Sequence, residues 1–385
     1  MTARCAIMQP MPRVAIVSEL SRAFDPRADA RNVSMVRRRH AWWDALRAEH
    51  GLPLALVDAA DVRRGAAELA DTRVAWIDLP MLPRGAYRAL WRTLGGRAPH
   101  ARVRDDPDDV AAVLGLDRIV PRLVAAGLPT PRTALLPLAP STVASITGPD
   151  DVRRELLKAI YAALDAAALD PHDGLFVRGF YSSAKSPNPK LWFARNQHDL
   201  VETTAALVAH LRGALEVGGL ALRAFHVLER VRLPTADLRA GTVTVPLEFR
   251  VTVLGGRALG VSYHGPYEVL EAHQRDALDD ALRARASAFD AIDALVPRLL
   301  AAGFPANFVA DVAFDADGSP LVLELNPLYA AGYNVPAAHA WVVASLAHAL
   351  VVDAGGESAA EATIARNAEA LLGAPIDRCP AFQRR

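Results

Sequence analysis

Three side chains near the C-terminal end of the sequence, Asp311, Glu324 and Asn326, have the types and spacing of ligands for a hard cation. Asp317-Gly318 lies between them and is a strong two-residue hairpin signal. With these two residues as the loop, Asp311 faces Glu324 across an antiparallel pair, and Glu324 and Asn326 share a face. The opposite face takes the leucines of the second strand, Leu321, Leu323 and Leu325. Opposed carboxylates repel each other, and Mg²⁺ turns that repulsion into binding. The alternative is an acidic hairpin that only faces solvent.

A second hairpin carries an acidic and a basic residue on one face. Gly255-Gly256 predicts its turn and places Tyr263 opposite Glu248. Glu248 and Arg250 are two residues apart and therefore share a face. The other face takes Phe249, Val251 and Val253. An ordinary surface ion pair is the alternative interpretation.

Basic residues follow an apolar strand further upstream. Residues 175–177 are apolar and lead into Arg178, and a short segment with Gly179 and two serines separates Arg178 from Lys185. Only three of the 43 basic residues are lysines, so a lysine in such a segment is informative. A guanidinium holds two phosphate oxygens at once and keeps its charge. The segment therefore favours a phosphate site, with two ordinary surface residues as the alternative.

The order and spacing of these segments resemble the ATP-grasp superfamily. Asp311, Glu324 and Asn326, spaced 13 and 2, are similar to its metal-binding motif, and the resemblance covers about residues 110–350. It is closest to a group with an Arg…Lys phosphate segment, a Glu-X-Arg strand and a Glu-Leu-Asn-Pro ending. The usual residue at the position of Arg178 is a lysine, so this chain departs from the common pattern there.

The resemblance implies a role for each motif. The residues expected to hold Mg²⁺ are Asp311, Glu324 and Asn326. Those expected to contact ATP are Arg178, Lys185, Glu229, Glu248 and Arg250, with Glu229 near the adenine at the hinge of residues 225–231. Arg250 and Lys185 are the expected catalytic residues. Further candidates for contact with substrate are His264, Tyr329, Tyr333 and Asn334.

The activity implied by the resemblance is ATP-dependent ligation with Mg²⁺. A carboxylate would be activated as an acyl phosphate and joined to an amine, with release of ADP and phosphate; both partners would be small molecules, with an amino acid or peptide among the candidates. Three alternatives stay open. They are an ATP-grasp phosphotransferase, a nucleotide-binding protein without turnover, and a structural or interaction protein.

The elements that must position these residues fall into two classes. Residues 11–100 alternate strand-like and helix-like segments, which predicts an α/β domain with a parallel sheet. The rest is expected to be an α+β ATP-grasp fold, with two lobes clasping ATP between antiparallel sheets. The predicted division is 1–106 for the α/β domain, 107–228 for linker helices and the small lobe, 229–352 for the large lobe, and 353–385 for a C-terminal tail or helix.

Composition excludes several other classes of protein. The 385 residues are 52% hydrophobic and carry a formal net charge of zero, which disfavours nucleic acid as the main partner. The two cysteines, Cys5 and Cys379, predict neither a disulfide framework nor a zinc site. No apolar run is long enough to predict a membrane span, and the N-terminal segment lacks a signal-peptide pattern, so we expect a cytoplasmic protein. The oligomeric state is left open, with a homodimer as one option.

Overall fold

The computed structural model describes most of the chain and divides it into two compact units. The described residues are 14–19, 30–50, 53–79, 84–139, 150–181, 192–211, 218–235, 242–330, 333–357, 360–376, 379 and 381–385. Unit 1 combines Met1–Pro107 with Tyr329–Arg384, and unit 2 is Asp108–Leu328 with Arg385. Residues 329–352, which the sequence-based division assigned to the large lobe, therefore cluster with unit 1.

Unit 1 contains the predicted parallel sheet. Its strands lie in the order β2-β1-β3-β4, and all the pairs are parallel. The bounds are β1 (Val14–Ser18), β2 (Leu54–Asp58), β3 (Val74–Ile77) and β4 (Arg102–Val103). Every residue of β1 and β3 is buried, as expected for short apolar runs in a sheet covered on both faces. The accompanying helices of the N-terminal segment are α2 (Ala30–His50), α3 (Ala59–Arg64) and α4 (Arg84–Arg97).

The C-terminal segment supplies the core helix of unit 1. Helix α13 (Pro336–Asp353) packs against α2, β3 and α14 (Glu361–Leu372), and nearly all of its side chains are buried. By length and composition α13 also qualifies as a membrane span, but a buried core helix passes the same test, so this is weak evidence for a membrane. The chain ends in a short strand, β15 (Phe382–Arg384).

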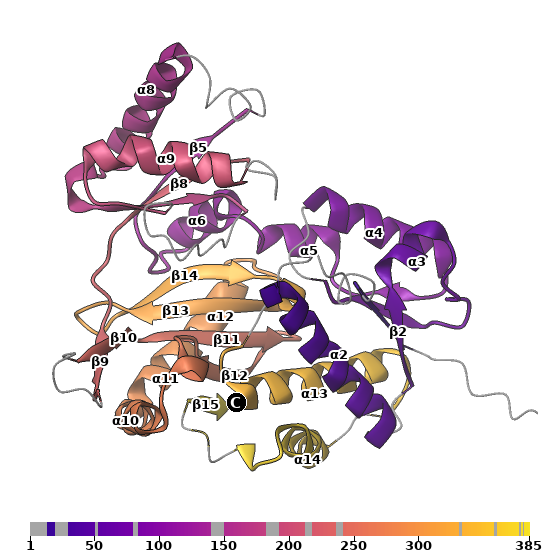
Figure 1. Ribbon diagram of the computed structural model, residues 1–385. Coiled ribbons are helices and arrows are strands. Elements are labelled where there is room, and N and C mark those ends of the chain that lie inside the picture. Colours follow the sequence, from indigo (N-terminus) through magenta and orange to yellow (C-terminus); the bar gives the residue numbers. More distant parts are fainter. Residues whose placement is uncertain are drawn as a thin grey trace, which may run out of the picture. The chain divides into compact units, whose positions relative to one another are not determined.

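Unit 2 begins with a small antiparallel sheet of order β5-β8-β6-β7, here called the small sheet. Its strands are β5 (Thr133–Pro137), β6 (Leu175–Gly179), β7 (Phe193–Ala194) and β8 (Gly219–Ala224). Helices α8 (Asp150–Ala166) and α9 (Gln197–Leu211) cover one face and share a core with Leu175, Val177, Leu220 and Leu222 (Figure 1). Side chains alternate along a strand, so Arg178 and Arg223 lie on the other face. The remaining helices before this sheet are α5 (Pro107–Ala112) and α6 (Leu116–Ala125).

A second antiparallel sheet, here called the large sheet, has neighbouring strands in the order β14-β13-β11-β12. These are β11 (Glu248–Leu254), β12 (Arg257–Tyr263), β13 (Phe308–Phe314) and β14 (Pro320–Asn326), and a separate hairpin pairs β9 (Arg230–Leu233) with β10 (Val243–Pro246). The single strand expected over 244–254 is thus two, because Leu247 leaves the ladder and its amide donates to the Glu229 carbonyl. The single helix expected over 272–301 is three: α10 (Ala272–Arg283), α11 (Ala286–Asp293) and α12 (Leu295–Ala301).

Candidate active site

The hairpin of β13 and β14 brings the two predicted metal-binding carboxylates together. Asp311 pairs directly with Glu324 in the register of the two strands, as predicted. Asn326 pairs with Val309 and lies on the same face as Glu324. Asp311 and Asn326 are both buried. The hairpin therefore places two carboxylates and one amide on one patch of the sheet.

The predicted turn of this hairpin is wrong, although the pairing is right. The amide of Asp315 donates to the Ser319 carbonyl, so Ala316, Asp317 and Gly318 form a three-residue loop. The resulting one-residue shift would place Leu323 opposite Asp311. A β-bulge next to Asp311 adds one residue to β14 and restores the Asp311–Glu324 pair. Because the bulge also reverses the alternation, Leu321 pairs with Ala313 and lies on the carboxylate face, not on the predicted core face.

A second bulge brings a histidine into the site. The two-residue turn at Gly255-Gly256 forms as predicted, with Leu254 opposite Arg257. A register shift at Thr252/Val253 then pairs Tyr263 with Phe249, so the prediction that Tyr263 faces Glu248 is wrong. His264 takes that place, and its amide donates to the Glu248 carbonyl at 2.7 Å.

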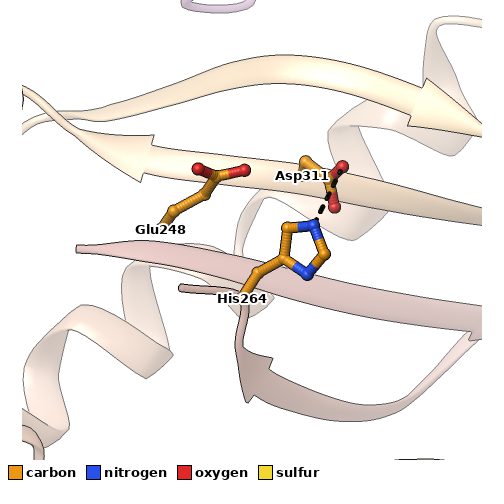
Figure 2. A group of neighbouring side chains, drawn as sticks. All are labelled: Glu248, His264 and Asp311. Atoms are coloured by element: carbon orange, nitrogen blue, oxygen red, sulfur yellow. Dashed lines mark ion pairs between the residues drawn. The ribbon is translucent and has the colours of Figure 1, made fainter. Parts of the chain in front are cut away.

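Glu248, His264 and Asp311 form a cluster on the large sheet (Figure 2). One ligand atom from each lies within 4.8 Å of the others, and His264 Nε2 is 4.0 Å from Asp311 Oδ2. Arg250 lies directly across from Asp311 in the register. Its Nε and Nη2 each donate to one carboxylate oxygen at 2.7 Å. Asp311 is therefore held by a bidentate, buried charge pair, which is the strong form of such a contact.

Arg178 of the small sheet pairs with Glu324 of the large sheet. Its Nη1 lies 3.0 Å from Glu324 Oε2, and both side chains are largely buried. Burial alone would lower the pKa of Arg178, but the charges of Glu324, Asp311 and Glu248 outweigh burial and raise that pKa. The structure thus brings together five of the predicted site residues from the two sheets: Arg178, Glu248, Arg250, Asp311 and Glu324.

Other predicted residues lie elsewhere or outside the described residues. The Glu229 side chain pairs with Arg285, and its backbone amide and carbonyl bond to Phe314 and Leu247. Lys185 lies outside the residues that the structure describes. The three candidates after β14 belong to unit 1, where the Tyr329 ring stacks on Tyr87 and Tyr333 contacts His339.

Sequence reasoning missed a buried arginine beside Arg178. Arg223 on β8 pairs in register with Phe176, and Arg178 on β6 pairs with Ala221, so both arginines lie on the same face of the small sheet. Arg223 Nη1 donates to the carbonyl of Leu323 at 2.8 Å. Burial first, and then the charge of Arg178, lower the pKa of Arg223 to about 10. The sequence signal was an arginine inside an otherwise apolar strand.

Sequence reasoning also missed a group of aromatic rings next to these arginines. Phe176 stacks on Trp192 with 5.5 Å between ring centroids, and Phe193 and Phe225 complete the group. Phe225 is 44% exposed although it is large and apolar. Phe176 lies between this group and the arginine face, so an apolar surface continues directly into a basic one.

Comparison with known families agrees with this geometry. Residues 182–350 match the family model of an ATP-grasp domain, the third family of its clade. The chain carries an ATP-grasp domain. The hairpin with Asp311, Glu324 and Asn326 lies inside the matched range, as do the Glu248–Arg250 strand and Arg223, whereas Arg178 lies just before it. The fold is thus an α/β N-terminal domain followed by an α+β ATP-grasp fold.

Solved structures of ATP-grasp proteins resemble the chain at low identity. A RimK domain ATP-grasp protein from Sphaerobacter thermophilus is 16% identical with a TM-score of 0.45, covering 82% of this chain and 91% of that one. The ATP-grasp ligase PsnB, in complex with a precursor peptide and AMPPNP, is 14% identical with a TM-score of 0.46 and coverages of 90% and 99%. D-alanyl-alanine synthetase A from Vibrio cholerae is 9% identical with a TM-score of 0.49 and coverages of 85% and 93%. No curated protein matches the sequence. The family model, not these structures, decides the assignment.

Proposed function

We propose that the protein is an ATP-dependent ligase that joins a small-molecule carboxylate to an amine. The observation that supports the proposal is the meeting of Asp311 and Glu324 with Arg178 and Arg250, since acidic and basic side chains from both sheets gather in one place. Phosphoryl transfer depends on positioning and charge neutralisation more than on covalent chemistry. Such a set of charges suits that reaction.

In the proposed reaction the substrate carboxylate oxygen attacks the γ-phosphorus of ATP, and the bond to the β-phosphate oxygen breaks. The acyl phosphate formed is then attacked at its carbonyl carbon by an amine, which loses a proton as phosphate leaves. Arg178 and Arg250 would neutralise phosphate charge, and Arg250 would also stabilise the oxyanion of the second step. An amino acid or peptide is the proposed substrate class, and the cytoplasm is the proposed location.

The residues on the large sheet fit a Mg²⁺ ion by their chemistry. Asp311 and Glu324 are directly opposed carboxylates, and the Asn326 amide follows on the same face. These are oxygen ligands, which Mg²⁺ prefers, and it completes its shell with substrate phosphates. The ion would supply charge neutralisation of the phosphates. His264 adds a nitrogen donor to the same cluster, next to Asp311.

An assay of ADP and phosphate release tests the proposal. We expect release from ATP·Mg²⁺ only when both pooled carboxylates and pooled amines are present, together with a rise in melting temperature on saturation with ATP·Mg²⁺. Glu324→Gln keeps the side-chain shape but removes an anionic ligand, so it should lower turnover at limiting Mg²⁺ at least about tenfold. Glu155→Gln is the matched control, because Glu155 pairs with Lys158 on an exposed helix face. Release without an amine would indicate a phosphotransferase, and no thermal shift would contradict ATP binding itself.

A further inference from the structure

We propose that Arg223 is a second phosphate-binding arginine, which acts with Arg178 on the same phosphate chain of the bound nucleotide. The inference rests on the proposed function, because it assigns a further residue to the same site. Arg223 was not among the residues expected from the sequence. Its burial, its unused donors and its charged neighbour support the assignment.

The first argument is that Arg223 has buried donors without an acceptor in the described part of the chain. Its side chain is buried, with 5% of the residue exposed. A guanidinium carries five N–H groups, and Nη1 donates to the Leu323 carbonyl. Nε and Nη2 are buried and have no hydrogen-bond partner among the residues that the structure describes. Unmet buried donors are costly, most of all on a charged group, so a ligand that accepts from them accounts for their presence.

The second argument is the local charge. Arg178 and Arg223 lie on neighbouring strands and on one face, and the nearest carboxylate, Glu324, is already bonded to Arg178. Two buried guanidinium groups therefore share one carboxylate. Burial and the charge of Arg178 lower the pKa of Arg223, which shows that the cation is under-compensated there. A multivalent anion between the two arginines would remove this repulsion.

The third argument identifies the anion. Guanidinium groups hold phosphoryl oxygens in pairs, which suits a phosphate chain that presents several of them. The register partner of Arg223 is Phe176, which belongs to the aromatic group with the exposed Phe225. An aromatic surface accepts the face of a nucleobase. A nucleoside polyphosphate matches this sequence of surfaces, whereas a carboxylate substrate offers neither the base nor the chain of phosphates.

The test is a series of calorimetric titrations with adenosine, AMP, ADP and ATP, each with Mg²⁺ and with EDTA. The full-length protein is compared with Arg223→Gln, which keeps one donor for the Leu323 carbonyl but loses the charge. Arg132→Gln is the matched control, because Arg132 is exposed, precedes β5 of the same sheet and donates to a backbone carbonyl. Arg223→Lys is made as well, so that a folded variant with the charge retained is available. Circular dichroism and melting curves confirm that each variant is folded.

We expect Arg223→Gln to weaken ADP and ATP binding at least about tenfold, with and without Mg²⁺, and to leave adenosine binding within about twofold. Arg223→Lys should lie between Arg223→Gln and the wild type, and Arg132→Gln should match the wild type. Equal affinities for ATP in wild type and Arg223→Gln would overturn the inference. So would a loss seen only with Mg²⁺, which would mean that Arg223 acts through Leu323 and Glu324. If the wild type binds no nucleotide, the proposed function fails with it; if the wild type binds and turns over ATP, only this inference is at stake.

Discussion

Two arginines hold the carboxylates that we expect to bind Mg²⁺. Arg250 makes a bidentate contact with Asp311, and Arg178 contacts Glu324. Breaking a buried pair leaves an uncompensated charge and is strongly destabilising. The same arginines that we assign to phosphate therefore also keep the acidic residues compensated when no ligand is bound.

The first prediction at this scale concerns Arg178→Lys. Lysine keeps the positive charge but loses the planar fork, so a bidentate phosphate contact would be lost. ATP binding should weaken by about 1–3 kcal/mol, measured by calorimetry. The control is Arg195→Lys, since Arg195 forms an exposed pair with Asp199. Unchanged ATP affinity and turnover in Arg178→Lys would show that Arg178 makes no bidentate contact with phosphate.

The second prediction concerns pH and His226, which follows β8. Burial first, and then the charge of Arg223, lower the pKa of His226 below its ordinary value. The unfolded chain, with a histidine pKa of about 6.5, therefore binds a proton at pH values where the folded protein does not. Stability should fall as pH drops below about 6.5, by at most about 1.4 kcal/mol per pH unit for this group. His226→Gln should show a shallower decline than wild type in urea unfolding between about pH 5 and 7.

The control for this prediction is His172→Gln, because His172 is exposed at a turn. His172→Gln should keep the pH dependence of the wild type. Identical slopes in wild type and His226→Gln would mean that His226 carries the same charge in the folded and unfolded states.

At the scale of elements, the site depends on two β-bulges. The alternation of apolar and polar residues is visible in the sequence and predicts the four strands of the large sheet to within a residue or two. A bulge has no such signal, because it inserts one residue without changing the composition of the strand. In β14 the bulge compensates for a turn that is one residue longer than predicted, so Asp311 still faces Glu324. In β12 no such compensation occurs, and His264 enters the site in place of Tyr263.

The remaining misses arise from contacts between elements that are distant in sequence. Arg223 and the rings of Phe176 and Phe225 become neighbours of Arg178 only when β6 and β8 pair. That pairing joins strands that are far apart along the chain, and no local pattern encodes its register. By contrast, motifs within one hairpin, such as Asp311 with Glu324, are local and were predictable.

Gly318 gives a prediction on the turn of the β13–β14 hairpin. Its φ is +76°, and a Cβ there would meet no other atom within 4 Å, so only the backbone conformation opposes a side chain. Gly318→Ala should lower the free energy of unfolding by about 1–2 kcal/mol, as measured by chemical denaturation. Gly318→Asn should cost less, because asparagine tolerates this region. Equal losses in the two variants would mean that the turn does not keep a left-handed residue at 318.

At the scale of the whole molecule, unit 1 is made from two segments separated by the entire ATP-grasp core of unit 2. Buried polar contacts tie those segments together within unit 1. Arg39 of α2 donates to the carboxylate of Asp78 and to the carbonyl of Tyr329, and Trp43 Nε1 donates to Asp78 at 2.9 Å. Asp78 is almost fully buried, so it compensates the charge of Arg39 where water cannot.

We therefore predict that Asp78→Asn destabilises unit 1 by about 3–5 kcal/mol, because the charge of Arg39 loses its buried partner. Differential scanning calorimetry would detect this as a large fall in melting temperature. Asp61→Asn is the control, since Asp61 pairs with Arg64 on an exposed helix face and should cost about 0–1 kcal/mol. If both variants lose the same small amount, the Arg39–Asp78 pair does not stabilise unit 1.

The pairing of Arg178 with Glu324 and of Arg250 with Asp311 has a consequence for the order in which ligands bind. A cation that engages either carboxylate must compete with an arginine, and a phosphate that engages either arginine must compete with a carboxylate. When one ligand has displaced its competitor, the partner left behind is free for the other ligand. Metal and nucleotide should therefore bind with positive cooperativity, and this coupling free energy must be the same whichever ligand binds first. The apo protein would then act as a coincidence detector, with weak affinity for either ligand alone and strong affinity for the two together.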